Sequence, residues 1–504
     1  MGRKRRQRIH AGQRTLDTEC LECNDNITVP IGPLTLVRKT FEVMGLPRLL
    51  NPMKRDQGAS VTEVTEALVS HSMQMQGLSI NRMEDILENP HKQQVYGISD
   101  DVDKNDLYRT CRILGRNLDT VVGHINSWLT ERLSISLKEV FLDWSASYVD
   151  GKPTDFIRFG HTKDHRPDRP QVSIGMALDH ISGLLCGLTV VSGNTNDTVH
   201  FKQTFSQVRP FLDPGCLLVF DAGAYSDENG KLVTKGFHFL TRAQINSSDM
   251  KYLGIEPGRW LRLDDDIRAY MYLGNNKRCK VIYYSQKRHD ELIAGYYAKA
   301  ERDYDEAIQL KKMVERDRPR KKYRNSNFFL DTRVGYVFPL DLDDRQTCIE
   351  RAVQSRITGR EGYFILMCSK VMLPRDMLQA YRSRNIIEDA YRDLKHGIDV
   401  RPIRCRNEEA IKGRVLIAYL ALLSLYLSKY LSPELKPLTA ESFVSDLNSF
   451  SLTIEVEDGK EVRRVHSNFN PTIRAVLSGF ERFSEAIAAN RRPKPYVTRW
   501  VSSL

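Results

Sequence analysis

The chain has 504 residues, 41% of them hydrophobic and 28% charged, and it carries a formal net charge of +11 at pH 7. This length and composition indicate a globular protein with roughly three domains and ample core. Its 9 cysteines are odd in number and scattered, which argues against a disulfide framework and favours a reducing cytoplasm.

The positive charge gathers in three short stretches, at residues 2–8, 316–324 and 491–495. Each alone could be a solvated tail or loop, but three in one basic chain favour a nucleic acid as partner. The first stretch is not followed by an apolar region, so we expect no signal peptide. The longest apolar run, residues 415–427, is too short to span a membrane and predicts a buried core helix, so no membrane partner is expected.

Residues 32–130 show apolar residues at three- and four-residue spacing, which predicts a set of helices. Ser60 and Asp106 are candidate N-terminal caps for two of these helices. We therefore expect a helical N-terminal domain, residues 1–135, that binds DNA ends. The same pattern would equally suit an interaction or dimerisation domain.

From about residue 137 the pattern changes to strands. Three strand-like runs are followed by an amphipathic helix, capped by Asn196 or Asp197, and then by a short apolar run that ends at Asp221. Asp143 lies within the first run. Adjacent strands could bring Asp143 and Asp221 together, as in ribonuclease-H-like folds.

Residues 236–380 contain further strand-like pieces, interrupted by a long charged helix at about 289–316. A segment this long with its own β pattern predicts an inserted subdomain. The expected fold class is α/β (α+β): a ribonuclease-H-like core interrupted by a β-rich insertion, with a helical N-terminal domain. After residue 135 the predicted domains are the first part of the core at 136–245, the insertion at 246–375, the core completion at 376–435, and a C-terminal region at 436–504 with a role in dimerisation.

The stretch 381–395 lacks Gly and Pro and is rich in helix formers, which predicts one continuous helix. Successive residues of a helix are turned by about 100° around its axis, so a phenol, a carboxylate and two cations fall within an arc of roughly 60°. The opposite side of the helix is apolar. The gathered residues are Tyr381, Arg384, Glu388 and Lys395, with Arg392 just beside them. An ordinary amphipathic helix with an Arg–Glu pair would show the same pattern, so a function requires matching carboxylates elsewhere.

Asp143, Asp221 and Glu388 supply that match and form the candidate site. Three carboxylates at sheet and helix ends are the hard oxygen ligands that two Mg²⁺ ions prefer, and Mn²⁺ can substitute for Mg²⁺. Such ions would activate a water or a 3′-hydroxyl and stabilise the leaving oxygen in a displacement at phosphorus. This chemistry needs no nucleophilic side chain.

Other carboxylates and metal-ligating residues compete with this interpretation. Asp150, Asp179 and Asp197 lie near the same segments, but each could be a cap or a turn residue. Cys20 and Cys23 form a lone CxxC pair, and a structural zinc site there is disfavoured because no second pair lies at zinc-finger spacing.

The segment 160–171 has two His four residues apart, which suggests zinc, but its Pro and polar content predict a loop. Lys163, His165 and Arg166 in this loop are candidate phosphate contacts. Trp260 could stack a flipped base, although a core position is favoured.

Taken together, these motifs resemble a DDE transposase of the IS-four superfamily of bacterial and archaeal insertion sequences. The resemblance rests on FLDWSAS around Asp143, on VFDAGAYS around Asp221, and on the stretches 160–171 and 193–197. The family's signature Y-x(2)-R-x(3)-E-x(6)-K is filled without a gap by Tyr381, Arg384, Glu388 and Lys395. The match covers about residues 137–430, and residues 32–130 more faintly.

The resemblance implies that Asp143, Asp221 and Glu388 bind the metal ions. It also implies that cations and the phenol of the signature position the phosphates of the transposon end. These phosphate-binding residues are Tyr381, Arg384 and Lys395, and Arg392 is a further candidate on the same helix.

The expected function is metal-dependent cleavage and strand transfer at terminal inverted repeats, by cut-and-paste transposition. One alternative is a ribonuclease-H-like DNA nuclease without strand transfer, and another is an inactive relative that only binds DNA. The expected partners are double-stranded DNA, at transposon ends and at the target, and a second copy of the chain in the DNA complex. The expected location is the prokaryotic cytoplasm, at the nucleoid, and the sequence leaves open whether a hairpin intermediate forms.

Overall fold

The computed structural model describes residues 26–489, except 55–57, 75–76, 161–165, 256, 275–277, 316–326, 333–334, 339–341, 343, 399 and 458–459. The three basic stretches and the Cys20–Cys23 pair therefore lie outside the described residues. The chain divides into two compact units, which we call the helical unit and the sheet unit. The helical unit contains the described residues up to Arg116, Asp393–Val400 and those from Glu409 onward, and the sheet unit contains Asn117–Arg392 and Arg401–Glu408.

The helical unit thus combines residues from the two ends of the chain, which the sequence analysis assigned to separate domains. The predicted domain boundaries and the predicted roles of the domains stay predictions. Its elements are β1 (Ile27–Pro30), α1 (Gly32–Met44), α2 (Leu46–Leu50), η2 (Asn51–Met53), α3 (Val61–Gln74), α4 (Ile80–Leu87), α5 (Pro90–Val95), α6 (Lys104–Arg116), the π-helical turn η6 (Asp393–Gly397), α15 (Glu408–Leu431), η7 (Pro433–Leu435), α16 (Ala440–Ser449), β13 (Ser451–Glu457), β14 (Lys460–Ser467) and α17 (Pro471–Ala488). β1, β13 and β14 pair antiparallel in a small sheet.

Helix α15 forms the core of the helical unit. Within the described residues it is long and apolar enough to cross a membrane, but 89% of its most hydrophobic window is buried inside the protein. The prediction of a buried core helix at 415–427 is therefore confirmed.

α6 and α15 approach closely at two glycines. A Cβ at Gly115 would lie 1.8 Å from the carbonyl oxygen of Glu409, and a Cβ at Gly413 would lie 1.8 Å from the carbonyl oxygen of Cys111. Only glycine fits at these two crossing points.

The two predicted helix caps have different outcomes. The Ser60 hydroxyl accepts a hydrogen bond from the amide of Glu63, whose carboxylate in turn accepts one from the Ser60 amide. This reciprocal pair confirms Ser60 as a cap of α3. Asp106 lies inside α6 instead, and its amide donates to the side chain of Asp103, which precedes the helix. The prediction of Asp106 as the cap was wrong because another acidic residue stands three positions earlier.

The sheet unit alternates strands and helices around one large sheet. Its elements are α7 (Leu118–Glu131), β2 (Glu139–Tyr148), β3 (Gln171–Asp179), β4 (Leu185–Ser192), α8 (Asp197–Val208), η3 (Arg209–Phe211), β5 (Leu217–Phe220), η4 (Ala222–Ala224), α9 (Asp227–Val233), β6 (His238–Ala243), α10 (Met250–Leu253), η5 (Pro257–Arg259), β7 (Leu261–Arg262), β8 (Ile267–Leu273), β9 (Cys279–Ser285), α11 (Gln286–Glu315), β10 (Leu330–Thr332), β11 (Gly335–Val337), α12 (Arg345–Gln354), β12 (Tyr363–Cys368), α13 (Pro374–Arg382) and α14 (Asn385–Arg392).

In the described part of the chain this sheet has nine strands, in the order β4-β3-β2-β5-β6-β12-β9-β8-β7. β4, β3 and β2 are antiparallel neighbours, whereas β2, β5 and β6 run parallel. Every residue of β3 is buried, since α8 and α14 pack against it. Such a wholly buried strand is typical of a sheet covered on both faces.

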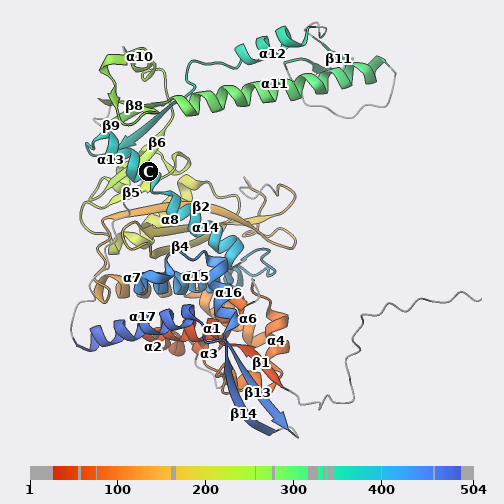
Figure 1. Cartoon of the computed structure of the whole chain (residues 1–504), viewed down its shortest axis with the longest axis vertical. Coiled ribbons are helices and arrows are strands. Elements are labelled where there is room, and N and C mark those ends of the chain that lie inside the picture. Colours follow the sequence, from red (N-terminus) through yellow and green to blue (C-terminus); the bar gives the residue numbers. More distant parts are fainter. Residues whose placement is uncertain are drawn as a thin grey trace, which may run out of the picture. The chain divides into compact units, whose positions relative to one another are not determined.

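The strands of the predicted insertion continue this sheet. β12 pairs antiparallel with β6 on one side and with β9 on the other, so the exposed edge of β6 is used to extend the sheet. Another part of the insertion is an arm, in which α11 runs beside α12 (Figure 1) and β10 pairs with β11 in a hairpin. The arm has its own small core, which includes Tyr304, Phe328 and Phe329.

Candidate active site

Asp143 and Asp221 come from neighbouring parallel strands. Phe141 of β2 lies opposite Val219 of β5, so continuing this register by two residues places Asp143 beside Asp221, directly after β5. The carboxyl end of β5 thus lies level with the middle of β2, and the carboxyl ends of parallel strands are where ligands bind in many α/β folds. Register alone therefore brings these two predicted carboxylates together.

The third carboxylate, Glu388, stands on a helix that is not continuous. α13 ends at Arg382 and α14 begins at Asn385, and the chain after Arg392 forms the π-helical turn η6. At the break the Ser383 hydroxyl donates to the carbonyl oxygen of Gln379, a local bond that competes with the helical backbone pattern. The prediction of one helix over 381–395 was therefore wrong, and so was the single arc derived from it.

The break nevertheless joins the signature residues to both aspartates. The Arg384 guanidinium lies 2.6 Å from Oε1 of Glu388 and 3.7 Å from Oδ1 of Asp143. The Tyr381 hydroxyl donates to Oδ1 of Asp221 at 3.1 Å. One guanidinium and one phenol thus connect the helix pair to the strand ends.

The surroundings of Tyr381 and Arg384 raise the pKa of both side chains. Burial, together with the negative charge of Asp221, raises the pKa of Tyr381 to about 12, so its hydroxyl stays a donor at neutral pH. Burial disfavours the charge on Arg384, but the surrounding carboxylates outweigh it and raise the pKa of the guanidinium. The site therefore holds a permanent positive charge among three negative ones.

Tyr391 is a supporting residue that the sequence did not reveal. It is buried on α14, and its hydroxyl donates to the backbone oxygens of Asp143 at 2.7 Å and Ile174 at 2.9 Å. These bonds fasten the helix that carries Glu388 to β2 and β3. An aromatic residue three positions after Glu388 on the same helix face was the signal available in the sequence.

The two remaining predicted cations lie apart from this cluster or outside the sheet unit. Arg392 is exposed and pairs with Asp389 at 2.7 Å. Lys395 belongs to η6 and to the helical unit, where it is 9% exposed. Their roles as phosphate contacts stay predictions.

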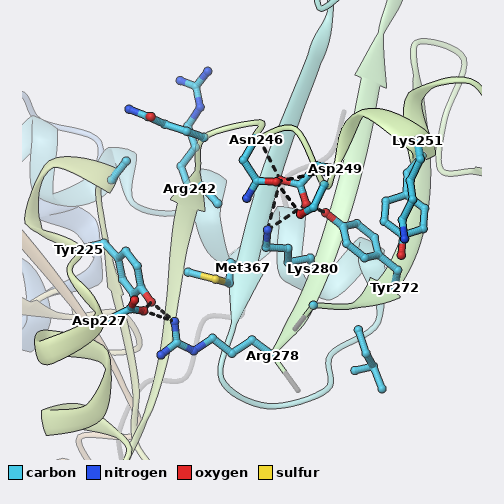
Figure 2. Close-up of a pocket in the computed structure, with 17 residues that line it drawn as sticks. Tyr225, Asp227, Arg242, Asn246, Asp249, Lys251, Tyr272, Arg278, Lys280 and Met367 are labelled. Carbon is cyan, nitrogen blue, oxygen red and sulfur yellow. Dashed lines mark hydrogen bonds and ion pairs between the residues drawn. The ribbon is translucent and has the colours of Figure 1, made fainter. Parts of the chain in front are cut away.

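One pocket lies on the β6 side of Asp221 and is rich in cations and tyrosines (Figure 2). Its volume is about 450 Å³, and Ala222 contributes to its wall. Arg278 bonds both the Tyr225 hydroxyl and Asp227, the latter at 2.9 Å. Its other polar residues include Arg242, Lys251, Tyr252 and Tyr272, and a buried Asp249–Lys280 pair at 3.0 Å.

A second pocket, of about 370 Å³, lies on the β2–β4 side, and its wall includes Gly223. Hydroxyl and amide side chains dominate its lining, and its charged residue is Asp197. α8 begins at Asp197 after Asn196, whose side chain makes no capping hydrogen bond. The turn directly after Asp221 therefore lies between two pockets: Ala222 contributes to the cationic one, and Gly223 contributes to a polar one whose charged residue is Asp197.

The competing residues have mostly structural environments. Asp179 is buried and accepts hydrogen bonds from the backbone and hydroxyl of Ser182, which makes it a turn residue; burial raises its pKa to about 6. Asp150 pairs with Arg169 at 2.8 Å. Trp260 donates to the carbonyl oxygen of Ile255 and packs against tyrosines.

In the loop at 160–171, both His and Lys163 lie outside the described residues, and the exposed Arg166 pairs with Asp168 at 2.9 Å. Across the parts of the chain that the structure describes, no group of three or more His, Cys, Asp or Glu side chains is arranged to hold a metal ion. At the candidate site the donors are of the type that a divalent ion prefers, but the Arg384 guanidinium already contacts two of them.

Comparison with known proteins decides the family. A family model described as the transposase DDE domain matches residues 136–424, more than half of the chain. The chain belongs to this transposase family. No curated protein matches it. Among solved structures, a piggyBac transposase in a synaptic complex with hairpin DNA is similar at a TM-score of 0.38 and 9% identity, over 93% of this chain and 83% of that one.

Proposed function

We propose that this member of the family is the transposase of an insertion sequence, which cuts and joins DNA at terminal inverted repeats by a cut-and-paste route. The observation that carries the proposal is the register that sets Asp143, within β2, level with Asp221, directly after β5, together with the connection of Glu388 to Asp143 through Arg384. Residues 136–424, which match the family, include all three carboxylates.

The strand order supports a ribonuclease-H-like core for this chemistry. Its first five strands, β2 to β6, lie in the order β4-β3-β2-β5-β6, three antiparallel followed by two more parallel to β2. α8 connects the antiparallel part to β5. This arrangement places the central strand β2, which carries Asp143, next to the strand that leads to Asp221.

Asp143, Asp221 and Glu388 are the residues proposed to hold two Mg²⁺ ions, or Mn²⁺ in their place. Bound there, the ions would supply an activated water or 3′-hydroxyl and stabilise charge on the leaving oxygen. The protein's own contribution is positioning. Tyr381 keeps Asp221 in place through its hydroxyl, and Arg384 offers the planar, always charged donor that suits a phosphate.

The proposed partners are double-stranded DNA and a second copy of the chain, and the proposed location is the bacterial or archaeal nucleoid. The cationic pocket beside Ala222 favours a polyanion next to the cleavage site. A nuclease without strand transfer and an inactive DNA-binding relative are the alternatives that the experiment must separate.

The test uses the DNA that flanks the gene as a labelled linear substrate for the purified protein, with Mg²⁺ or with EDTA. We expect metal-dependent nicks at a pair of inverted repeats and joining of the cut ends to a second DNA. Scattered nicks without joining would indicate the nuclease. Binding without nicks would indicate the inactive relative.

A matched variant connects this result to the site. Glu388→Gln keeps the shape of the side chain but removes a charged ligand, so we expect it to abolish cleavage while DNA-end binding is retained. Equal cleavage by the variant and the parent protein would contradict the assignment of the site.

A further inference from the structure

Arg384 is the cation that balances the three candidate carboxylates. Its guanidinium contacts Glu388 at 2.6 Å and Asp143 at 3.7 Å, and its side chain is only 14% exposed. Asp221 belongs to the same charge cluster, because its negative charge also raises the pKa of Arg384. A single buried positive charge therefore serves the whole site.

A divalent ion would need the same oxygens that Arg384 now contacts. Carboxylate oxygens are the ligands of such ions, and Oδ1 of Asp143 and Oε1 of Glu388 face the guanidinium. Two cations that share these oxygens repel each other, which opposes joint binding. The absence of a metal-like grouping among the described side chains agrees with this arrangement.

The geometry points to a competition in which Arg384 is an internal counter-ion that a metal ion must displace from Asp143 and Glu388. The inference rests on the proposed function, because it concerns the metal-binding role of the same site. It adds a regulatory property: the metal affinity of the DNA-free protein is held low by the protein's own arginine.

The position of Arg384 allows such a displacement. It lies at the break between α13 and α14, outside both helices. Its Nε is buried and, among the described residues, has no hydrogen-bond partner, so the guanidinium keeps one unused donor. A DNA phosphate can take a guanidinium through two parallel bonds, and that exchange would free the carboxylates for metal. Metal binding and DNA binding would then strengthen each other.

The test measures Mn²⁺ binding to the DNA-free, full-length protein from the electron paramagnetic resonance signal of the unbound ion. Arg384→Gln removes the charge but keeps a polar side chain of similar length. We expect it to bind Mn²⁺ about tenfold or more tightly than the parent protein, within the usual range of site-to-site coupling. Adding Glu388→Gln to this variant should remove the gain.

Arg392→Gln is the matched control, since it removes the same charge from the adjoining helix α14, where Arg392 pairs with Asp389. Its Mn²⁺ affinity should equal that of the parent protein. A gain as large as that of Arg384→Gln would mean that net charge alone, and not displacement, sets the affinity, and would overturn the inference.

Two further results would also overturn the inference, and only the first of them is compatible with the proposed metal site. If Arg384→Gln binds Mn²⁺ no more tightly, while Glu388→Gln alone weakens binding, the competition is wrong but the metal site stands. If no variant changes Mn²⁺ binding, both the competition and the proposed site are wrong.

Thermal unfolding gives a second measurement that also reports folding. Without metal, Arg384→Gln should melt at a lower temperature than the parent protein, because three carboxylates lose their counter-ion. Mn²⁺ should raise its midpoint by more than it raises that of the parent protein. If the glutamine variant does not fold, Arg384→Lys, which keeps the charge but loses the planar fork, should show a smaller gain in Mn²⁺ affinity; a lysine variant with unchanged affinity would then contradict the inference.

Discussion

Two of the three candidate carboxylates are held by strands, and the third is held by a helix. Asp143 and Asp221 are placed by the register of β2 and β5, which is set by three consecutive paired positions just before them. Glu388 is placed by α14, which is fastened to the sheet by the Tyr391 hydroxyl and connected to Asp143 by Arg384. The positions of Asp143 and Asp221 (the strand part of the site) therefore depend on backbone pairing. The position of Glu388 (the helix part) depends on a few side-chain contacts. The predictions below test that difference.

The largest effect is expected from the strand part. Asp221→Asn should lower the rate of DNA cleavage on the order of 10³-fold or more, because a neutral amide cannot replace a charged ligand in the transition state. The thermal midpoint should change little, since the amide oxygen can still accept the Tyr381 hydroxyl. Single-turnover cleavage and thermal unfolding measure the two properties. Asp265→Asn, at a fully exposed carboxylate, is the control that should cleave normally.

The fastening of the helix part is tested by Tyr391→Phe. The change removes one hydroxyl that serves two backbone carbonyls, so it should lower the free energy of unfolding by about 1–3 kcal/mol. Cleavage should also fall, because α14 carries Glu388. Urea unfolding measures the first effect. Tyr284→Phe, whose exposed hydroxyl bonds Gln286, should lose far less stability, and an equal loss in both would show that Tyr391 does not fasten the helix.

A carboxylate at the other end of the same strands provides a pH test. Asp179 lies opposite Val140, and burial raises its pKa to about 6, above the unfolded value of about 3.9. A raised carboxyl pKa contributes stability that is present below the unfolded value and lost as pH rises through about 6. The unfolding free energy of the parent protein should therefore fall relative to that of Asp179→Asn between about pH 4 and 6.

Urea unfolding at several pH values across this window measures the difference. A constant offset between the two proteins would show that Asp179 does not titrate there.

The smallest effect is expected at the exposed end of α14. If Arg392 contacts one DNA phosphate, Arg392→Ala should weaken DNA binding a few-fold and reduce the slope of log affinity against log salt by about 1. The measurement is fluorescence anisotropy over a series of salt concentrations. An unchanged slope would leave Arg392 as a surface charge paired with Asp389.

The sequence alone pointed to candidate residues that are marked by a short motif or by their position at the end of a strand or helix. Asp143 within an apolar strand and Asp221 at the end of another could be read directly, because strand residues alternate and a buried strand ends at a polar turn. Glu388, Arg384 and Tyr381 could be read from their spacing, and Ser60 from its capping pattern. The buried helix at 415–427 followed from its composition.

Only the tertiary structure decided how these pieces join. Helix propensity gave one helix over 381–395, but the chain leaves the regular helix between Arg382 and Asn385. The β pattern predicted an inserted subdomain, and its pairing with the main sheet through β6 and β12 could be seen only in the tertiary structure. Nor could spacing show that Tyr391 bonds β2 and β3, or that the Arg384 guanidinium contacts both Asp143 and Glu388. For the β6–β12 pairing, the Tyr391 bonds and the Arg384–Asp143 contact the physical reason is the same: they join residues far apart in the chain, and no local pattern records them.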